Sequence, residues 1–532
     1  MKLQGLPSSN PELWALGRGR RDFLCALLLL LLGLFGAAAL AVWQGQDGGW
    51  DLRNYHWYVP YALFEGRLGF DVLPAFMGPS FHNPLIDVPF FLAARAFGPL
   101  AATFMLGLVQ GANILPLYLI ARRVLADAPK SLAALVALTG IAGAMNMGLL
   151  GATAGDNLLS LFVLGALAAL LAGPRHLLLA GALAGAGFGL KTVLAPFILG
   201  IGLSVMLIER RQPRRILGFA LAGILGTVLT GGWWMAVLYA DFGNPLMPYF
   251  NNLFHSPYVP PLGFSDPGFT DRLPWPRVHL PFIAGLVDHV AAEQAFTDLR
   301  LPFAYGAALL LLLRAPAGPA RRLALVTVAT LVPWSIGFAI YRYVLAFEML
   351  GPVLLLAALA LVGRRLAWGR LLAWGGGLAL LVLMVAVTRP LVTERVAFGA
   401  TVTGVQVPAL ADPARQIVLM AGLTPSAFVI PDFPPMVRFL RFDGYWIDPA
   451  EQEAGYARAI RQALAAPGVE ANILYDPADQ ARVTAALGQF LPGASIGNCQ
   501  PVPHGFAKPG TNWGHLVLCR LEGWRQAPGL MN

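Results

Sequence analysis

Apolar runs of about 20 residues recur along this chain of 532 residues, and polar loops separate them. A run of this length crosses the hydrocarbon core of a bilayer as a helix. The chain is 57% hydrophobic and only 12% charged, whereas soluble domains carry about 25% charged residues. The composition therefore excludes a soluble globular protein and predicts an α-helical polytopic membrane protein.

We expect about 11 transmembrane helices from these runs. They cover residues 22–43, 100–121, 131–150, 156–173, 176–190, 192–208, 216–239, 301–314, 322–340, 344–363 and 371–388. Lys191 splits one pair of runs, which can also form one long helix plus a re-entrant segment. The first run lacks a small-residue cleavage site, so we expect a retained helix and not a signal peptide.

Basic residues concentrate in the loops on one face of this topology. The clusters lie at 18–21, 122–130, 210–215, 314–322 and 364–370. The positive-inside rule assigns this face to the cytoplasm, which also accounts for the net charge of +9 without a nucleic-acid partner. We therefore expect a bacterial inner-membrane protein with a cytoplasmic N-terminus. The loops 44–99 and 240–300 are then periplasmic, and residues 84–98 form a short helix at the outer interface.

The chain divides into a transmembrane domain, 1–390, and a C-terminal segment, 391–532. In that segment, helical patterns at 451–465 and 478–490 alternate with short apolar runs, which predicts a small extracytoplasmic α/β domain. The runs begin at Ile417, Ala427, Asn472 and Leu516. Cys499 and Cys519 both lie here and can pair in an oxidising compartment.

The first outer loop holds the densest group of polar side chains, within Trp50–Tyr61 (WDLRNYHWYVPY). Ionisable residues pressed against a bilayer are costly and mark function. Transfer of a sugar to a hydroxyl group needs a general base within hydrogen-bond reach of that hydroxyl. We predict that Asp51, at the top of the first helix, is this catalytic base. The alternative is that Asp51 caps the helix that follows.

Five further residues of this loop are expected to bind substrate: Asn54, Tyr55, His56, Arg67 and Asn83. The tyrosines at 55, 58 and 61 fit an interfacial belt as well as a platform for a sugar. For Glu65, Asp71 and Asp87 we expect solvated or helix-capping side chains.

Polar residues at the ends of later spans extend the candidate site. Lys191 and Arg342 are expected to bind the phosphate of a donor, because arginine grips phosphate with two donors and a membrane lysine seeks an anion. Asp156 and Asn157 open a span at its outer end and either cap it or line the substrate cavity. No P-loop, dinucleotide-binding glycine motif or zinc-ligand pattern is present. We therefore expect no metal and no other cofactor.

The arrangement resembles the GT-C superfamily of polyprenyl-phosphate-sugar-dependent glycosyltransferases. The elements that carry the resemblance are Asp51, the segment Asn83–Phe91 (NPLIDVPFF) and a span that ends in Ala121-Arg122-Arg123. The resemblance implies an inverting glycosyltransferase with a polyprenyl-phosphate sugar as donor. It also implies a cell-envelope glycan, lipid or protein as acceptor, and contact with membrane lipids.

Three other functions compete with this interpretation. A transporter or flippase of lipid-linked glycans typically has inverted repeats and broken helices at the midplane, and neither is evident here. A glycan polymerase or ligase with lipid-diphosphate donors would favour an arginine-rich outer site. A sensor or scaffold would leave the loop acids without a role. The concentration of ionisable residues at the outer ends of the spans favours an enzyme.

Overall fold

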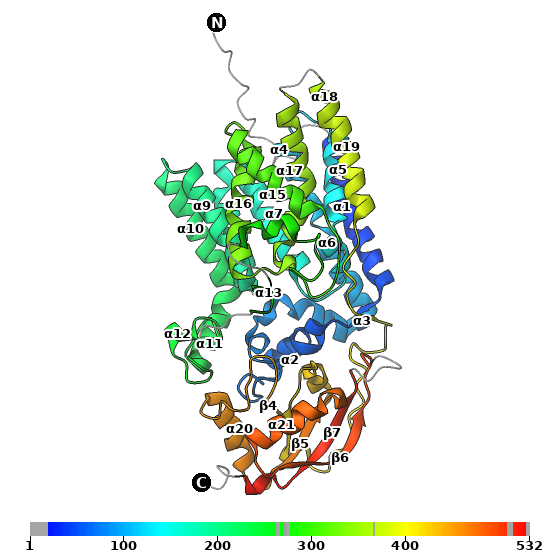
Figure 1. Ribbon diagram of the computed structural model, residues 1–532, viewed down its shortest axis with the longest axis vertical. Helices are drawn as coiled ribbons and strands as arrows, with labels where there is room; N and C mark the ends of the chain where they lie inside the picture. Colours follow the sequence, from blue (N-terminus) through cyan, green and yellow to red (C-terminus); the bar gives the residue numbers. More distant parts are fainter. Residues whose placement is uncertain are drawn as a thin grey trace.

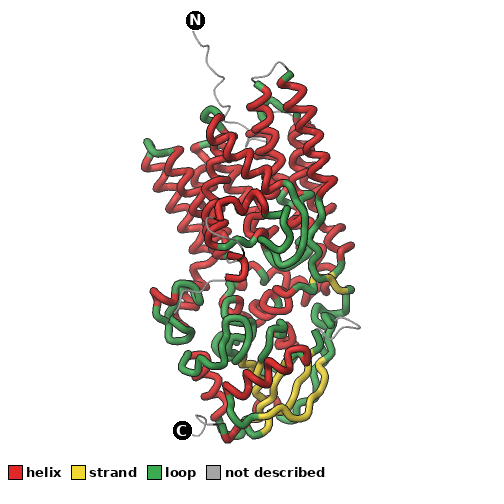
Figure 2. Tube along the Cα trace, in the orientation of Figure 1, coloured by secondary structure: helices red, strands yellow, loops and turns green. Residues whose placement is uncertain are grey.

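The computed structural model describes residues 20–261, 267–270, 272, 277–364, 368–507 and 514–527. Arg18 and Arg365, which contribute to the predicted cytoplasmic clusters, lie outside these residues. A bundle of helices forms one end of the molecule and a β-sheet with two helices forms the other (Figure 1). Nearly all strands gather at that second end (Figure 2). Helix α2 (Tyr58–Phe64), from the first outer loop, lies between the two ends.

The bundle contains the following helices: α1 (Arg20–Gln44), α3 (Val88–Gly111), α4 (Ile114–Val124), α5 (Lys130–Ile141), α6 (Ala144–Gly148), α7 (Asp156–Ala172), α8 (Leu177–Leu190), α9 (Ala195–Ile208), α10 (Pro213–Thr227), α11 (Trp233–Phe242), α15 (Arg300–Arg314), α16 (Pro319–Gly337), α17 (Leu345–Gly363), α18 (Gly369–Leu371) and α19 (Gly377–Val387). The described part of the second outer loop contains three short helices: α12 (Asn251–Phe254), α13 (Pro267–Thr270) and α14 (Leu280–Ile283).

Several helices have the length and composition of membrane spans. Within the described residues, four are long and apolar enough to cross a bilayer: Phe23–Gln44, Val88–Val124, Pro213–Phe242 and Tyr341–Gly363. Shorter apolar helices occupy Lys130–Ile141, Asp156–Ala172, Thr192–Ile208 and Ala373–Val387. These helices agree with a polytopic helical membrane protein, and the number of 11 spans stays a prediction.

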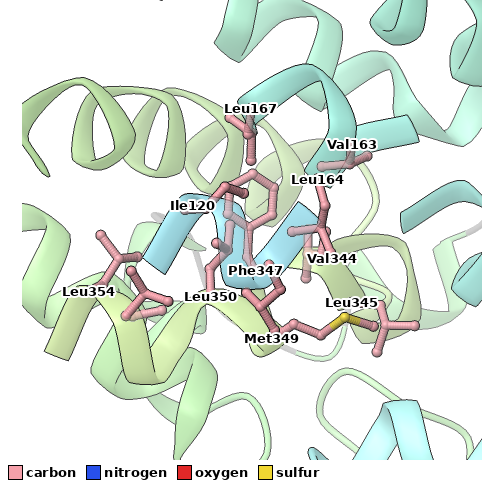
Figure 3. Close-up of a cluster of buried hydrophobic side chains, with 14 of the residues drawn as sticks. Ile120, Val163, Leu164, Leu167, Val344, Leu345, Phe347, Met349, Leu350 and Leu354 are labelled. Carbon is pink, nitrogen blue, oxygen red and sulfur yellow. The ribbon is translucent and has the colours of Figure 1, made fainter. Parts of the chain in front are cut away.

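Helix α17 forms the core of the bundle. Its Phe347 and Leu350 are buried among Val163, Leu164 and Leu167 of α7 and Ile120 of α4 (Figure 3). The packing of α8 against α10 depends instead on small residues. A Cβ atom on Gly185 of α8 would lie 1.8 Å from the carbonyl oxygen of Gly223 in α10, so only glycine allows this approach.

Two interruptions shape the helices of the bundle. Lys191 has extended backbone angles (φ −153°, ψ 117°) and separates α8 from α9, so the pair is not one continuous helix. Helix α3 has a kink at Gly98, whose φ of 84° suits glycine. The segment expected to form a short helix, 84–98, comprises a 3₁₀ turn (η3, Pro84–Ile86) and the part of α3 that precedes this kink.

The C-terminal segment folds around a five-stranded mixed sheet with the order β4-β3-β5-β7-β6. Its strands and helices are β3 (Gln416–Met420), β4 (Arg438–Arg441), β5 (Glu470–Tyr475), β6 (Ser495–Val502), β7 (Leu516–Glu522), α20 (Gly455–Ala465) and α21 (Gln480–Phe490). Strand β3 pairs in parallel with β4 and β5, whereas β7 runs antiparallel to β5 and β6. Cys499 and Cys519, register partners on β6 and β7, form a disulfide.

One predicted strand of this segment is wrong. The apolar run that begins at Ala427 forms a 3₁₀ helix, η11 (Ala427–Asp432), and contains Pro431. Its first four side chains are all buried. A short, fully buried run has no periodicity that distinguishes a strand from a helical segment.

The first outer loop adds its own backbone to the edge of the sheet. Val72 pairs in parallel with Leu440. The Val72 amide donates to the carbonyl of Phe439 at 3.0 Å, and the Arg441 amide donates to the carbonyl of Val72 at 2.9 Å. A second link pairs β1 (Gln46–Asp47) with β2 (Arg395–Val396). The C-terminal segment therefore contacts the loop that carries Asp51 on both sides of that residue, once through β2 and once through the edge of the five-stranded sheet.

Candidate charged site at the helix ends

Asp51 lies at the start of an unusual helical segment. Leu52–His56 form a π-helix (η1), and π-turns are rare and often occur at functional sites. The side chain of Asp51 makes no capping hydrogen bond with η1, so the capping alternative is wrong for this residue. Its carboxylate instead pairs with the guanidinium of Arg342, which is 291 residues away in the sequence.

Arg342 connects two carboxylates. It lies in η8 (Tyr341–Val344), a 3₁₀ turn that leads directly into α17. Its Nη1 atom contacts Asp51 Oδ2 and lies 3.6 Å from Asp156 Oδ2. The side chains of Arg342 and Asp51 are 17% and 18% exposed, so the pair is mostly desolvated but still accessible from outside. The guanidinium therefore lies between two carboxylates at a position that solvent can reach.

Asp156 and Lys191 complete the charged group. Gly155 adopts φ 82°, which lets the preceding loop turn into α7 with Asp156 as the first helical residue. Asp156 makes no capping hydrogen bond in the described structure, which leaves the cavity-lining alternative. The buried Lys191 ammonium donates to the Ala154 carbonyl at 2.8 Å, two residues before Asp156. An ammonium has three donors, so Lys191 retains capacity for an anion.

A second buried pair lies beside this group. His56 Nδ1 and Asp87 Oδ1 are 2.6 Å apart, and both side chains are buried. The expectation of a solvated Asp87 is therefore wrong, because its side chain is buried against His56 of η1. The Tyr55 ring stacks on His82 with centroids 4.8 Å apart and meets His56 at a tilted angle with centroids 3.9 Å apart. Tyr55 and His56 thus join the candidate site.

The charges around Asp51 determine its ionisation. Burial alone would raise the pKa of Asp51, but the charges of Arg342, His56 and Lys191 outweigh burial and hold that pKa well below its usual range. The neighbouring His82 has a pKa well below its usual value because of burial and of the charges on Lys191 and His56. At neutral pH, Asp51 is therefore a carboxylate and His82 a neutral imidazole.

An apolar cavity opens beside Arg342. Its volume is about 280 Å³ including the open mouth. Asp156 and Arg342 form the charged part of its wall. The remaining wall is mainly hydrophobic, from α7, the turn Thr192–Leu194, α9, η8 and α17. It comprises Leu159, Ser160, Val163, Leu194, Phe197, Tyr343, Ala346 and Phe347. The cavity combines a cation with a hydrocarbon wall, which suits an anionic group attached to an apolar chain.

Arg67 does not join this site. Its guanidinium donates to Asp71 through two nitrogens, at 2.7 and 2.8 Å, and to the carbonyls of Pro435 and Val437. Asp71 is fully buried in this pair, so the expectation of a solvated Asp71 is wrong. The two residues are four positions apart in a turn and not in a helix, so helical spacing does not explain this ion pair. Arg67 holds the outer loop to the C-terminal segment.

Two amides of the predicted site also serve the framework. Asn83 donates to the carbonyls of Gly189 and Thr230 and accepts from the Leu85 amide. Asn157 donates to Asn146 at 2.7 Å. Both therefore position Lys191 and Asp156 indirectly, through the segments next to them.

Asn54 is different, because it is fully buried and neither atom of its amide has a hydrogen-bond partner within the described structure.

The tyrosine pattern of the outer loop has a structural explanation. Tyr55, Tyr58 and Tyr61 are all buried, so they form neither an interfacial belt nor an open platform for a sugar. The Tyr58 hydroxyl donates to Asp71 at 2.9 Å. Sequence reasoning missed His82, which stacks on Tyr55, and Tyr343, whose ring lies 5.4 Å from the Arg342 guanidinium. Their only signal was adjacency to residues already identified.

The fold and this cluster define a class: a polytopic helical membrane protein with a charged site where the helices meet the outer loops. Among the described residues, no group of three or more His, Cys, Asp or Glu side chains is arranged to hold a metal ion.

Comparison with known proteins gives similarity to solved structures only. No protein-family model matches the chain, and no curated protein matches it. The chain is similar to ArnT from Cupriavidus metallidurans bound to undecaprenyl phosphate, with 15% identity and a TM-score of 0.49 over 93% of this chain and 97% of that chain. It is also similar to the Archaeoglobus fulgidus oligosaccharyltransferase in its apo form, with 12% identity and a TM-score of 0.41 over 94% and 77%. The structure of that oligosaccharyltransferase tethered to an acceptor peptide gives 12% identity and a TM-score of 0.39 over 94% and 76%.

Proposed function

We propose that the chain is a membrane glycosyltransferase that transfers a sugar from a polyprenyl-phosphate donor to an extracytoplasmic acceptor. The observation that carries this proposal is the position of Arg342, which borders an apolar cavity and contacts both Asp51 and Asp156. A phosphate attached to a long hydrocarbon chain matches this combination of a cation and an apolar wall. Lys191 adds a second positive charge close to Asp156.

In the proposed reaction, side chains of this protein accept the proton of the acceptor and stabilise the charge of the departing phosphate. The acceptor hydroxyl attacks the anomeric carbon while the bond from that carbon to the phosphate oxygen breaks, which inverts the configuration. The hydroxyl proton passes to Asp51, which acts as general base. The departing lipid phosphate keeps the bonding electron pair, and Arg342 and Lys191 stabilise its charge. This step requires no cofactor.

The pairing of Asp51 with Arg342 couples donor binding to base strength. In the unliganded site, the guanidinium keeps the pKa of Asp51 low, which makes the carboxylate a weak base. A donor phosphodiester competes with Asp51 for Arg342 and brings one negative charge, shared by two oxygens, to the cluster. Asp51 then loses part of its stabilisation as an anion and becomes a stronger base. The site therefore activates its base only when donor is present.

The predicted topology belongs to the same proposal. It has about 11 spans, a transmembrane domain at 1–390 and a periplasmic domain at 391–532, with the N-terminus in the cytoplasm of a bacterial inner membrane. The disulfide between Cys499 and Cys519 supports this assignment, because disulfides persist in oxidising compartments. Tyr55 and His56 remain candidate substrate contacts.

The experiment that tests the function is transfer of radiolabelled sugar by purified protein in nanodiscs. Donors are synthetic polyprenyl-phosphate sugars and one polyprenyl-diphosphate sugar, and acceptors are fractions of the bacterial cell envelope. Asp51→Asn is compared with Asp288→Asn, an isosteric control at an exposed ion pair of the second outer loop. We expect Asp51→Asn to reduce kcat by about 10²-fold or more while donor binding persists.

The outcomes separate the competing functions. Protein that binds lipid-linked sugar without cleaving it, and moves it between leaflets, is a transporter or flippase. Turnover of the diphosphate donor alone indicates a polymerase or ligase. Equal activity of Asp51→Asn and Asp288→Asn would refute Asp51 as the base.

A further inference from the structure

Three aromatic rings meet beside Asp51, from parts of the chain that are far apart in sequence. Trp50, which immediately precedes Asp51, stacks on Phe76 with ring centroids 5.7 Å apart and planes at 6°. Tyr445, in the turn after β4, meets both rings edge-on, with centroids 6.0 Å from Trp50 and 5.4 Å from Phe76. We name Trp50, Phe76 and Tyr445 the aromatic corner.

The aromatic corner has a buried base and an open rim. Phe76 is fully buried, Trp50 is partly exposed and Tyr445 is 41% exposed. The guanidinium of the buried Arg441 lies over the Phe76 ring at 4.1 Å. Arg441 also donates to the Pro74 carbonyl at 3.0 Å and to Ser426 Oγ at 2.9 Å. Phe76 is thereby fixed, while the rings of Trp50 and Tyr445 remain accessible to solvent.

Hydrogen bonds, an ion pair and close packing hold the turn that presents Tyr445. Gly444 and Ile447 exchange backbone hydrogen bonds across it, and Trp446 adopts φ 60°, a conformation uncommon for a bulky side chain. A Cβ atom on Gly444 would lie 2.4 Å from Phe76 Cε1, so glycine is required for this close approach. At the base of the turn, Asp443 pairs with Arg482 at 2.7 Å. Strained backbone of this kind persists where the surroundings hold it, and it clusters at ligand sites.

The chemistry of the aromatic corner selects one class of ligand. Exposed aromatic rings on a rigid support stack against flat apolar surfaces, and a pyranose ring offers such a surface through its C–H groups while its hydroxyls project from the rim. The nearby charges of Asp443 and Arg482 are already paired with each other. Asp51 directly follows Trp50 in the sequence, so a sugar that stacks on this ring is bound next to the proposed base.

We propose that Trp50 and Tyr445 bind a carbohydrate acceptor, stacking one sugar ring so that its hydroxyl reaches Asp51. This inference rests on the proposed function for its chemistry and deepens it by naming the acceptor class. It also gives the C-terminal segment a part in substrate binding, since Tyr445 belongs to the turn after β4.

A role in packing alone predicts a different response to substitution. Leucine at 445 preserves apolar bulk against Phe76 but removes the ring face, whereas phenylalanine preserves the face and removes only the hydroxyl. Met436, 58% exposed in the same segment, provides a matched control for loss of an exposed apolar side chain. The variants are Tyr445→Leu, Tyr445→Phe and Met436→Ala.

The first measurement uses the nanodisc assay with a donor that the protein is found to cleave. Three acceptors are compared: octyl β-glycosides, a serine- and threonine-containing peptide, and water. For the glycosides, Tyr445→Leu is expected to raise the acceptor KM about 10-fold, the size of one aromatic stacking interaction. The ratio of transfer to donor hydrolysis falls accordingly. Tyr445→Phe restores both values, and Met436→Ala matches wild type.

A second measurement does not depend on turnover. Saturation-transfer NMR with cellotetraose and maltotetraose on the Asp51→Asn protein is expected to give the strongest transfer to the C–H protons of one sugar face, and Tyr445→Leu in that background to remove it. The proposal is overturned if saturation transfer is absent, or if Tyr445→Leu leaves both KM and saturation transfer at the Met436→Ala values. Efficient transfer to the peptide with the same dependence on Tyr445 would reassign the acceptor class. If the protein cleaves no donor but shows saturation transfer to one sugar face, the carbohydrate site is supported and the proposed glycosyltransferase function is refuted.

Discussion

Replacement of Asp71 by asparagine tests how the C-terminal sheet holds the outer loop. Asp71 accepts hydrogen bonds from Arg67 at 2.7 and 2.8 Å, from the Tyr58 hydroxyl at 2.9 Å and from the Phe439 amide at 2.9 Å. The side chains of the ion pair are 3% and 0% exposed. Asp71→Asn keeps the shape of the side chain but leaves the guanidinium of Arg67 buried without a counter-charge.

The magnitude follows from burial. Breaking a buried ion pair by removing one partner costs about 3–5 kcal/mol, because the remaining charge is uncompensated. The pair of Arg415 with Asp412 is a useful contrast, since its side chains are 64% and 48% exposed. Such surface pairs contribute about 0–1 kcal/mol. The free-energy cost of Asp71→Asn should therefore be about 3 kcal/mol larger than that of Asp412→Asn. This difference is a factor of about 150 in an equilibrium constant.

Hydrogen exchange measures this difference locally. The amides of Val72 and Arg441 form the bonds that join the loop to β4, so their exchange reports separation of the two. We expect Asp71→Asn to accelerate exchange at both amides by about 10²-fold and Asp412→Asn to change it by less than about 5-fold. Equal protection in the two variants would refute the claim that this buried pair holds the interface.

Three further predictions concern pH, the disulfide and the cavity. Burial, with a contribution from the charge of Arg53, lowers the pKa of His504 from 6.5 to about 4. The unfolded chain then takes up a proton before the folded one, so the free energy of unfolding decreases as pH falls from about 6.5 to 4, and His504→Gln reduces this decrease in a thermal-unfolding series. Replacing Cys499 and Cys519 together by alanine opens a link across 20 residues and is expected to cost about 3 kcal/mol, measured as a lower unfolding midpoint under oxidising conditions, with no change under reducing conditions. Ala346→Phe fills the apolar cavity and is expected to raise the KM for the donor about 10-fold in the transfer assay, more than the acceptor KM.

Local sequence patterns predicted those parts of the molecule that depend on composition and short spacing. The apolar runs predicted helices, and Lys191 correctly marked a break between two of them. Asp51, Lys191 and Arg342 were identified because a charge at the end of a span is costly unless it has a role. Sequence could not predict that Arg342 pairs with Asp51, since no local rule links residues 291 positions apart.

The failures have the same physical origin. Asp87 looks like a helix-capping residue, but the fold buries it against His56, 31 residues earlier. Tyr445 carries no signal in its own neighbourhood, and its significance comes from Trp50, which arrives from the other end of the chain. The aromatic corner is therefore visible only after the sheet and the outer loop have been placed together.

The strand-like contact of Val72 with β4 has a consequence for the order of events during synthesis. Residues 70–74 hydrogen-bond to a stretch that the ribosome makes some 368 residues later. Until then the loop around Asp51 cannot pair with strand β4. Proteins are made from the N-terminus, and contacts of large sequence separation form late. A nascent or prematurely ended chain carries the acid without the scaffold that shapes its surroundings. The charged cluster therefore acquires its final geometry only after the C-terminal sheet has formed.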